Sequence, residues 1–424
     1  MLHTEPVDEP AVPRRTAGHV VVLALWAAVS VVLVFTTVRP WMPEIGLFAG
    51  GADLDVYRDG ARHVMEDLPL YTEPVIHGLL YTYTPFSTLA FIPFGLLPGG
   101  YDKYIWMATN LLLLVGIVAL CRKMLGERMS ARVVATSALT AVACTFLEPV
   151  RTTLFYGQIN LVLMALVLWD ASRGDRSRLR GVGVGLAAGI KLTPAYFVLY
   201  YLALRRWRAA IVAAVTFVAT VAGSWLVLPS DSRQYWTETF FESTRIAPDT
   251  HPSNQSLRGV VAHITERPAP VVLWLVLALA VVAVSMWIAV RLHTQGERLL
   301  AVTVAGLSAA VVSPFSWSHH WVWFVPLLVY IAHRAATRPR WWLAALVVYL
   351  GAGAWPYRWD EEVVVVGLFL FPPDWAVTDV LVNIYPLLYV GVLVGAGVLA
   401  FRGDTPVGRH PATPSPGRPA TIPT

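Results

Sequence analysis

Long apolar runs alternate with short basic segments along most of the chain. A helix of about 20 apolar residues spans a hydrocarbon layer ~30 Å thick, so each run is a candidate membrane helix. The candidate spans lie near residues 20–38, 102–121, 133–150, 158–172, 209–228, 270–290, 299–316, 320–335, 341–356 and 379–401. Residues 181–204 are interrupted by Lys191 and Pro194 and predict two further short helices that go out and back. The pattern therefore predicts an all-α, polytopic integral membrane protein of about 12 transmembrane helices with loops on the outer face.

Basic residues predict the orientation of these helices. Lysine and arginine concentrate in residues 122–132, 173–180, 205–208, 291–298 and 334–340. Such clusters favour the cytoplasmic side of a membrane. With all of them inside, three outer loops follow, at about 39–83, 229–269 and 357–378. The first two carry mixed charges and aromatic residues, so we expect the chemistry on the outer face.

Both ends of the chain are predicted to be cytoplasmic. Residues 1–17 form an N-terminal segment, and the apolar run from Val20 to Val38 is interpreted as a retained signal anchor. It is too long for the core of a signal peptide and lacks a small-residue cleavage pattern. Residues 18–402 then make up the transmembrane domain. Residues 403–424 are rich in Pro, Gly and Thr, which predicts a disordered cytoplasmic tail.

One apolar run does not fit the scheme. The stretch from Thr84 to Leu97 is short and contains Pro85 and Pro93. A crossing there would place the next basic cluster on the wrong side of the membrane. We interpret it as an interfacial or re-entrant helix on the outer face, and a short true span is the alternative.

Composition excludes a soluble protein. Hydrophobic residues make up 56% of the 424 residues and charged residues only 14%, against roughly 25% charged in soluble domains. The net charge is +5, and its placement gives no reason to expect nucleic acid as a partner. Cys121 and Cys144 both lie in apolar runs, so neither a disulfide framework nor a cysteine metal site is expected.

The first outer loop holds two aspartates next to an amphipathic segment. It reads GGADLDVYRDGARHV, with Asp53 and Asp55 followed by Tyr57 and Arg58. Aspartates are common at the start of surface helices, which is the simplest interpretation. Alternatively, one carboxylate is a general base, or both bind a cation or sugar hydroxyls. A pair of aspartates two residues apart does not by itself decide between these.

A second polar group lies between two late spans. The string SPFSWSHHWVW places Trp317, His319 and His320 at the membrane interface. An aromatic belt explains the tryptophans. The histidines need polar partners at that depth, because burying an unpaired polar group costs several kcal/mol. Neighbouring residues point to different sides of a helix, so we expect one histidine to face a cleft and the other to be tied structurally.

Two cations lie outside the basic inner clusters. Lys191 is at the tip of the short hairpin GLAAGIKLTP, and Arg258 is in the string SNQSLRG. Lys191 either extends to the interface or binds an anion. Arginine suits phosphate oxygens because its donors form a fork. Lys191 and Arg258 are therefore candidates for one phosphate site, with His320 as a third donor.

Further outer residues could contact a substrate. These candidates are Tyr83 in YTYTP, Tyr156, Gln158 and Asn160 in FYGQIN, and Asn254 and Gln255 in SNQSLRG. Residues 254–256 also match the N-glycosylation triplet, a match that is common by chance. Trp236, Phe240 and Phe241 offer either sugar platforms or membrane anchors.

Taken together, these strings carry a resemblance to a known family. DLDVYRDGARHV with PLY and YTYTP resembles the first outer loop of membrane glycosyltransferases of the C superfamily. FYGQIN, GIKLTP, NQSLRG and SWSHHWVW look more narrowly like glycosyltransferase family 87. That resemblance implies an inverting, polyprenol-phosphate-mannose-dependent α-1,2-mannosyltransferase of the actinobacterial phosphatidylinositol mannoside or lipomannan type.

The resemblance also implies roles for the residues. The family pattern makes Asp53 the expected base, while Asp55 supplies a second carboxylate that family members often lack. Lys191, Arg258 and one of His319 and His320 would stabilise the departing phosphate. The chain shows no phosphate-binding glycine loop, and we expect neither a metal nor another cofactor. The expected partners are the lipid-linked donor, a glycolipid acceptor and membrane lipids, with a monomer in the plasma membrane and an outward-facing site.

Transport is the alternative function. A flippase or carrier for a polyprenyl-linked sugar could use an intramembrane lysine and a broken hairpin. The polar candidates cluster on one side of the membrane rather than at its midplane, which favours an enzyme.

Overall fold

The computed structural model describes residues 17–37, 48, 50–76, 78–97, 100–242, 247–355, 366–370 and 376–402. In these ranges the protein is built from helices, and its one sheet is the two-stranded hairpin β1 (Pro74–Ile76) and β2 (Leu79–Leu80). The α-helices are α1 (Ala17–Thr37), α2 (Ala52–Met65), α3 (Pro85–Gly95), α4 (Asp102–Met124), α5 (Ala131–Cys144), α6 (Glu148–Tyr156), α7 (Asn160–Ser172), α8 (Val182–Ile190), α9 (Tyr196–Ala203), α10 (Trp207–Val227), α11 (Pro229–Thr237), α12 (Leu257–Thr265), α13 (Val271–Thr294), α14 (Arg298–Val312), α15 (Phe324–Ala335), α16 (Trp341–Gly351), α17 (Thr378–Leu381) and α18 (Ile384–Arg402). Short 3-10 turns are η1 (Thr193–Ala195), η2 (Thr239–Phe241), η4 (Ser318–Trp323) and η5 (Leu368–Leu370). The all-α prediction is confirmed.

Fewer helices than predicted are long enough to cross a membrane. Within the described ranges these are α1, α4, α10, α13 and α18, and α6 with α7 forms one more if a bent pair counts as a span. The structure thus supports five or six spans and not the predicted count of about 12. Several other apolar runs fold into shorter helices, including α5, α14 and α16, which are too short to count as spans by length.

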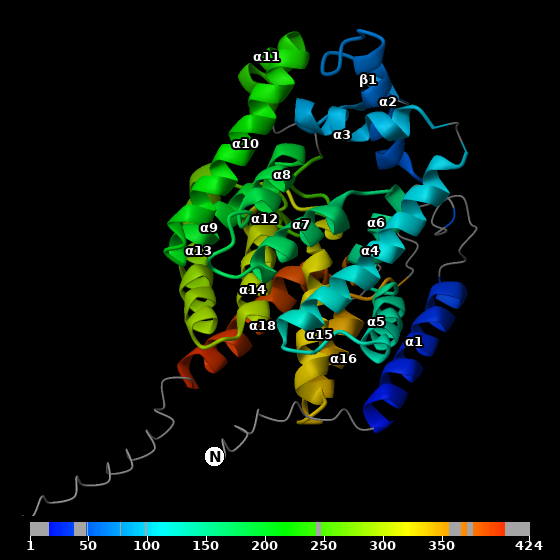
Figure 1. The fold of residues 1–424 in the computed structure, drawn as a ribbon, viewed down its shortest axis with the longest axis vertical. Coiled ribbons are helices and arrows are strands. Elements are labelled where there is room, and N and C mark those ends of the chain that lie inside the picture. Colours follow the sequence, from blue (N-terminus) through cyan, green and yellow to red (C-terminus); the bar gives the residue numbers. More distant parts are fainter. Residues whose placement is uncertain are drawn as a thin grey trace, which may run out of the picture.

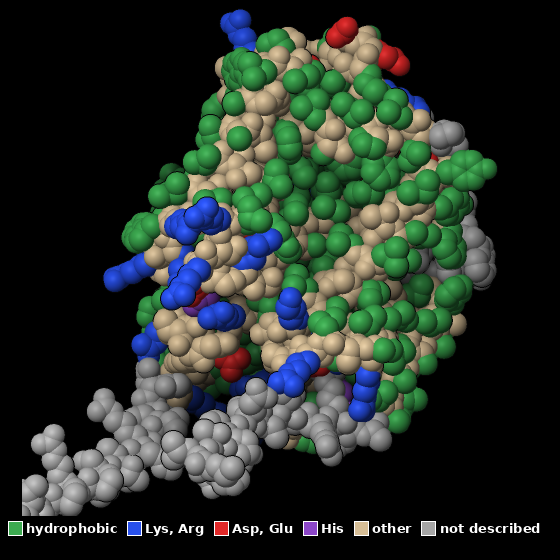
Figure 2. Space-filling model, viewed as in Figure 1, with side chains coloured by type: hydrophobic (Ala, Val, Ile, Leu, Met, Phe, Trp, Pro, Cys, Tyr) green, Lys and Arg blue, Asp and Glu red, His purple; other side chains and the backbone are tan. Residues whose placement is uncertain are grey.

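The outer surface of the long helices is apolar, as expected for contact with lipid. Leu112, Val218, Leu279 and Val394 are large side chains that are each at least 60% exposed. Figure 2 shows hydrophobic side chains over most of the middle of the molecule, while lysine and arginine gather in its lower half. A soluble protein rarely exposes so continuous an apolar surface, so the protein is a membrane protein.

The run from Thr84 to Leu97 folds into a short helix that contacts the long helices α10 and α4. It forms α3, with Pro85 in the first turn and Pro93 inside the helix. Proline at the first position suits a helix start, because the missing N–H would have no helical partner there. Figure 1 shows α3 lying across the long axis near the upper end of the molecule, packed against α2. At 11 residues, α3 is too short to cross a membrane alone.

A sharp bend between α6 and α7 positions the residues considered next. The two helices meet at 119°. Gly157 stands at the bend with a φ of 74°, and a Cβ there would lie 2.6 Å from the Cβ of Leu54. Trp106 donates a 2.8 Å hydrogen bond from Nε1 to the carbonyl of Gly157. Glycine therefore allows both the turn and the close approach of α2.

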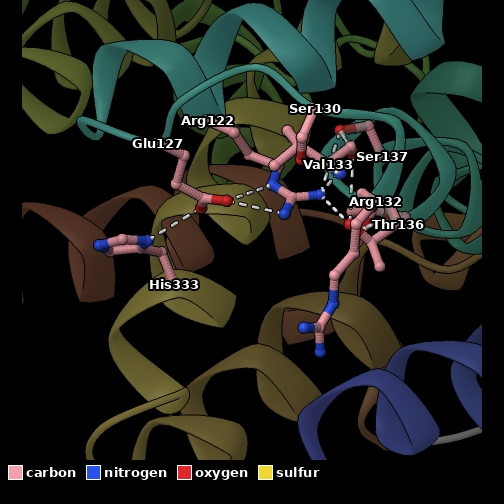
Figure 3. A network of polar contacts seen from close by, with 9 residues as sticks. Arg122, Glu127, Ser130, Arg132, Val133, Thr136, Ser137 and His333 are labelled. Carbon is pink, nitrogen blue, oxygen red and sulfur yellow. Dashed lines mark hydrogen bonds and ion pairs between the residues drawn. The ribbon is translucent and has the colours of Figure 1, made fainter. Parts of the chain in front are cut away.

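A buried polar cluster joins α4, α5 and α15 at their basic ends (Figure 3). Its centre is Arg122, which is 3% exposed and donates to Glu127 Oε2 at 2.7 and 3.0 Å. Arg122 Nη1 also donates to the carbonyl of Val133, while the other Glu127 oxygen lies 3.3 Å from His333 Nδ1. We call this group the Arg122 cluster. Arg122, one of the basic residues used to predict orientation, is thus a paired structural charge.

Three predicted segments fall largely outside the description. These are most of residues 1–17, the tail at 403–424 and most of the loop at 357–378.

Candidate active site

Asp53 lies in the first turn of α2, beside the bend between α6 and α7. Gln158, which follows the bend, hydrogen-bonds to the Asp53 carboxylate, and the amines of Lys191 and Lys103 lie within electrostatic range. Burial raises the pKa of Asp53 to about 6, and these three neighbours limit the rise. The carboxylate is therefore poised to gain or lose a proton near neutral pH, which is what a general base needs.

Two tyrosines hold Gln158 in place. The Tyr57 hydroxyl lies 3.0 Å from Gln158 Oε1 and 2.9 Å from the Tyr83 hydroxyl. The Tyr83 hydroxyl is 3.4 Å from the same amide. Tyr57 comes from α2 and Tyr83 from the segment before α3, so the bonds join three separate parts of the chain. This network fixes the amide that contacts Asp53.

Lys191 reaches the site from the break after α8. Its backbone is extended at the end of the helix, and its Nζ lies 3.0 Å from His320 Nε2 and 3.5 Å from Asn160 Oδ1. The amine also lies 5.2 Å from the centre of the Tyr83 ring. Burial lowers the pKa of Lys191 to about 8, against the attraction of Asp53. Lys191 stays mostly protonated at pH 7 among partners that are largely neutral.

The two histidines differ in their surroundings. Burial and the charge of Lys191 hold the pKa of His320 well below its ordinary value, so this ring is neutral. Its Nε2 then accepts from Lys191 and its Nδ1 carries the hydrogen, for which the described residues supply no acceptor. The His319 ring is stacked 6.2 Å from Trp317, and its backbone carbonyl accepts from Asn160 at 3.1 Å. His320 is the histidine whose ring contacts Lys191, and the His319 Nε2 has no partner among the described residues.

Below Lys191 and His320 lies a narrow apolar slot with a cavity volume of about 40 Å3. Asn160, Lys191 and His320 form its polar part. Its apolar walls come from α7, η1, α9, α14 and η4, through residues Leu163, Met164, Val167, Pro194, Phe197, Gly306, Ala309, Ala310, Val322 and Trp323. A cation at one end and an apolar wall along the rest match a lipid that carries an anionic head.

Other predicted site residues have different contacts. Arg58 pairs with Asp55 at 3.2 Å and with Asp102 at 2.5 Å. Arg258 pairs with Asp249 at 2.8 Å, and no contact among the described residues joins it to Lys191. The structure thus places Asp55, Arg58 and Arg258 in ion pairs.

Asn254 and Gln255 are fully buried, and their side chains hydrogen-bond to the backbone of other segments. Asn254 Oδ1 accepts from the backbone N–H of Ser316, and Gln255 Oε1 accepts from that of Tyr385. They hold the segment before the two histidines against the start of α18. Tyr156 lies 6.3 Å from the His319 ring, at the edge of the site.

Sequence reasoning missed Lys103 and Glu148. Lys103 lies within electrostatic range of Asp53 and donates to the backbone carbonyl of Leu154 at 2.8 Å. Glu148 is fully buried and accepts hydrogen bonds from Ser318 and Tyr385 at 2.7 and 2.6 Å. A lysine at the expected outer end of a span departs from the positive-inside pattern, and this signal could have identified Lys103.

Fold and site together define a class of protein: a helical membrane protein with a carboxylate, a lysine and a neutral histidine gathered beside a narrow apolar slot. The model of glycosyltransferase family 87 matches residues 81–314. The chain belongs to glycosyltransferase family 87. The matched region includes Lys191 and the bend at Gly157 but neither Asp53 nor the two histidines.

Relatives support this membership over most of the chain. A polyprenol-phosphate-mannose-dependent α-(1-2)-phosphatidylinositol pentamannoside mannosyltransferase of Mycolicibacterium smegmatis is 35% identical over 377 residues, covering 84% of this chain and 88% of the relative. A phosphatidylinositol mannoside mannosyltransferase of Mycobacterium tuberculosis, also polyprenol-phosphate-mannose-dependent, is 33% identical over 371 residues, covering 82% and 84%. An α-(1→3)-arabinofuranosyltransferase of M. tuberculosis is 29% identical over 245 residues, covering 56% and 54%. No solved structure gives a significant match.

Proposed function

We propose that the protein is an inverting mannosyltransferase. It moves mannose from polyprenyl-phosphate mannose to a mannosylated glycolipid of the phosphatidylinositol mannoside or lipomannan type and forms an α-1,2 linkage. Family membership and the names of the relatives support the activity. The observation that carries the proposal is the position of Lys191, which contacts His320 at the end of an apolar slot and lies within electrostatic range of Asp53.

The reaction needs a base and a site for an anion. Asp53 takes the proton from the acceptor hydroxyl, and the hydroxyl oxygen attacks the anomeric carbon of mannose. The bond between that carbon and the donor phosphate oxygen breaks, and polyprenyl phosphate leaves with the electron pair. A β-linked donor attacked from the opposite face gives an α-mannoside.

Lys191 and His320 stabilise the charge that develops on the leaving phosphate. Lys191 supplies a buried positive charge whose described partners are mostly neutral, and His320 supplies an N–H without an acceptor. Donors held in a low-dielectric site contribute more than in water, because they need not reorganise as the charge forms. The slot would take the first units of the prenyl chain, widening as the chain enters.

The orientation belongs to the same proposal. The site faces the outer side of the plasma membrane, and the shorter apolar helices cross together with the long ones to bring the number of crossings to about 12. The protein acts as a monomer. Single cysteines placed at positions 176 and 206 should resist a membrane-impermeant thiol reagent in intact cells, whereas strong labelling there would reverse the orientation.

The experiment that tests the activity is a transfer assay. Purified protein in vesicles receives radiolabelled polyprenyl-phosphate mannose and a phosphatidylinositol mannoside acceptor. The expected result is a new glycolipid with one added mannose in α-1,2 linkage. A flippase or carrier would move the donor between leaflets and form no glycoside, so donor movement without product would favour transport.

A further inference from the structure

A second cleft lies outside the site built around Asp53. One wall is the segment that leaves α2, residues 64–72, and the other is the junction of α10 with α11, residues 227–234. The cavity volume is about 520 Å3, within the usual range for small-molecule sites. Figure 1 shows both walls near the upper end of the molecule, where α11 and β1 project.

The lining of this cleft is polar and carries negative charge. Asp67 and Asp231 supply carboxylates, Gln234 an amide, and Thr72 and Ser230 hydroxyls, while Leu68 and Pro229 add apolar surface. Among the described residues, no lysine, arginine or histidine lines it, although His63 lies within electrostatic range of Asp231. Carboxylates and hydroxyls accept hydrogen bonds from the hydroxyl groups of a ligand, and the two carboxylates disfavour a phosphate group beside them. This chemistry selects a neutral ligand rich in hydroxyl groups.

The walls are tied together, and one of them holds an unusual backbone. Asp231 accepts a 3.3 Å hydrogen bond from the backbone N–H of Leu70, which joins the two sides. Asp67 has a φ of 55°, a conformation that side chains other than glycine seldom adopt. Its exposed carboxylate has no hydrogen-bond or ion-pair partner among the described residues.

The cleft and the candidate active site share α2 and a chain of hydrogen bonds, but they lie at different ends of that helix. Val64 follows Asp53 by 11 residues on the same helix, which corresponds to ~17 Å along its axis. Tyr71 lines the cleft and donates to the carbonyl of Tyr83, whose own hydroxyl contacts Gln158 beside Asp53. The cleft is too far away to hold the reacting sugar. It is suitably placed for other sugars of the same molecule.

We propose that this cleft is an acceptor subsite that binds the inner sugars of a neutral oligosaccharide while its terminal sugar meets Asp53. The inference rests on the proposed function, because it assigns a binding site to the sugars of the acceptor that do not react. It predicts a preference for acceptors that carry several sugars over those that carry one.

The test fills the cleft with a bulky side chain. Ser230→Trp places an indole in the lining, and Arg233→Trp adds the same bulk to an exposed position of α11 that does not line the cleft. Two acceptors are compared, a tetramannosyl glycolipid and octyl α-mannoside. In Ser230→Trp the KM for the tetramannosyl acceptor should rise about tenfold, as expected when one or two hydrogen bonds are lost. The KM for octyl α-mannoside and for the donor should not change, and Arg233→Trp should match the wild type.

Equal changes with both acceptors, or no change with either, would overturn the subsite. Gln234→Ala carries the test if Ser230→Trp fails to fold, with a smaller rise of about threefold. Binding of free mannotetraose, measured by saturation-transfer NMR, separates this inference from the proposed function. If the wild type transfers no mannose but binds mannotetraose, and Ser230→Trp alone loses that binding, the proposed activity is wrong and the assignment of the cleft as a sugar-binding site is supported. If mannose is transferred but mannotetraose binds all three proteins equally, the subsite assignment is wrong and the proposed activity is supported.

Discussion

The Arg122 cluster and the site around Asp53 and Lys191 both bury charged groups, but they satisfy them differently. In the Arg122 cluster, the guanidinium meets a carboxylate, a backbone carbonyl and hydroxyls, and the carboxylate meets a histidine. At the other site, Lys191 is bonded to a neutral imidazole and an amide, while the nearest carboxylate, Asp53, is bonded to Gln158. The first region has all its strong partners within the protein, and the second leaves part of its hydrogen-bonding capacity unused.

This difference is the basis for expecting a structural role for the first region and a functional role for the second. A buried ion pair that is fully hydrogen-bonded stabilises one arrangement of helices, and removing one partner is costly because it leaves the other charge unpaired. A buried cation with weak partners can gain interactions when an anion arrives. Stability should therefore depend on the Arg122 cluster and turnover on Asp53 and Lys191.

The largest expected effect on turnover comes from Asp53→Asn. The amide keeps the shape of the side chain but cannot take up the hydroxyl proton, so kcat should fall about 10²- to 10⁴-fold. Thermal stability and donor binding should stay near wild type. Asp55→Asn is the control, since Asp55 pairs with Arg58 instead. An inactive Asp55→Asn beside an active Asp53→Asn would move the base to Asp55.

Arg122→Met should lower stability and leave turnover nearly unchanged, the reverse of the result expected for Asp53→Asn. It removes the guanidinium that pairs with the buried Glu127 carboxylate, and breaking such a buried pair typically costs 3–5 kcal/mol of folding free energy. Denaturation in detergent should show this loss, while the folded fraction keeps nearly wild-type kcat. The double variant Arg122→Met/Glu127→Gln should recover part of the stability. A variant as stable as wild type would show that the ion pair does not hold the helices together.

Lys191→Met should affect the donor more than the acceptor. A charge-assisted bond to phosphate contributes about 1.5–3 kcal/mol, so kcat/KM for the donor should fall about ten- to hundredfold. The acceptor KM should change little. If this variant uses polyprenyl-phosphate mannose normally, the lysine only extends toward the membrane interface. Lys103→Met is a comparison at a second cation near Asp53 and tests whether the effect is specific to the contact with His320.

The smallest effect is a dependence on pH within the physiological range. Asp53 acts as a base only when ionised, so with a pKa of about 6 the rate should fall as the pH drops through 6. Lys191 binds phosphate only when protonated, so with a pKa of about 8 the rate should also fall as the pH rises through 8. The profile of kcat/KM should be bell-shaped, and Lys191→Met should lose its alkaline limb. An unchanged alkaline limb would assign it to another group.

The order of residues singled out several residues of the candidate site but not all their contacts. The strings around Asp53, Lys191 and His320 stood out because polar groups in apolar surroundings need partners. The sequence did not reveal that Arg258 pairs with Asp249 or that Arg58 pairs with Asp102. Those partners are separated along the chain and are joined only by folding. Glu148 was missed for the same reason, since its contacts come from η4 and α18.

The sequence by itself determined the class of fold, because long apolar runs with few charges are stable only as helices in lipid. Its motifs also determined the family, since a few polar residues at a membrane surface define the chemistry. Only the tertiary structure decided how many helices are long enough to cross, because breaks and bends such as that at Gly157 depend on what packs beside them. It also decided which charged groups pair with one another, as in the Arg122 cluster, and which keep unused hydrogen-bonding capacity, as beside Asp53. That division depends on contacts between distant segments, which no local pattern records.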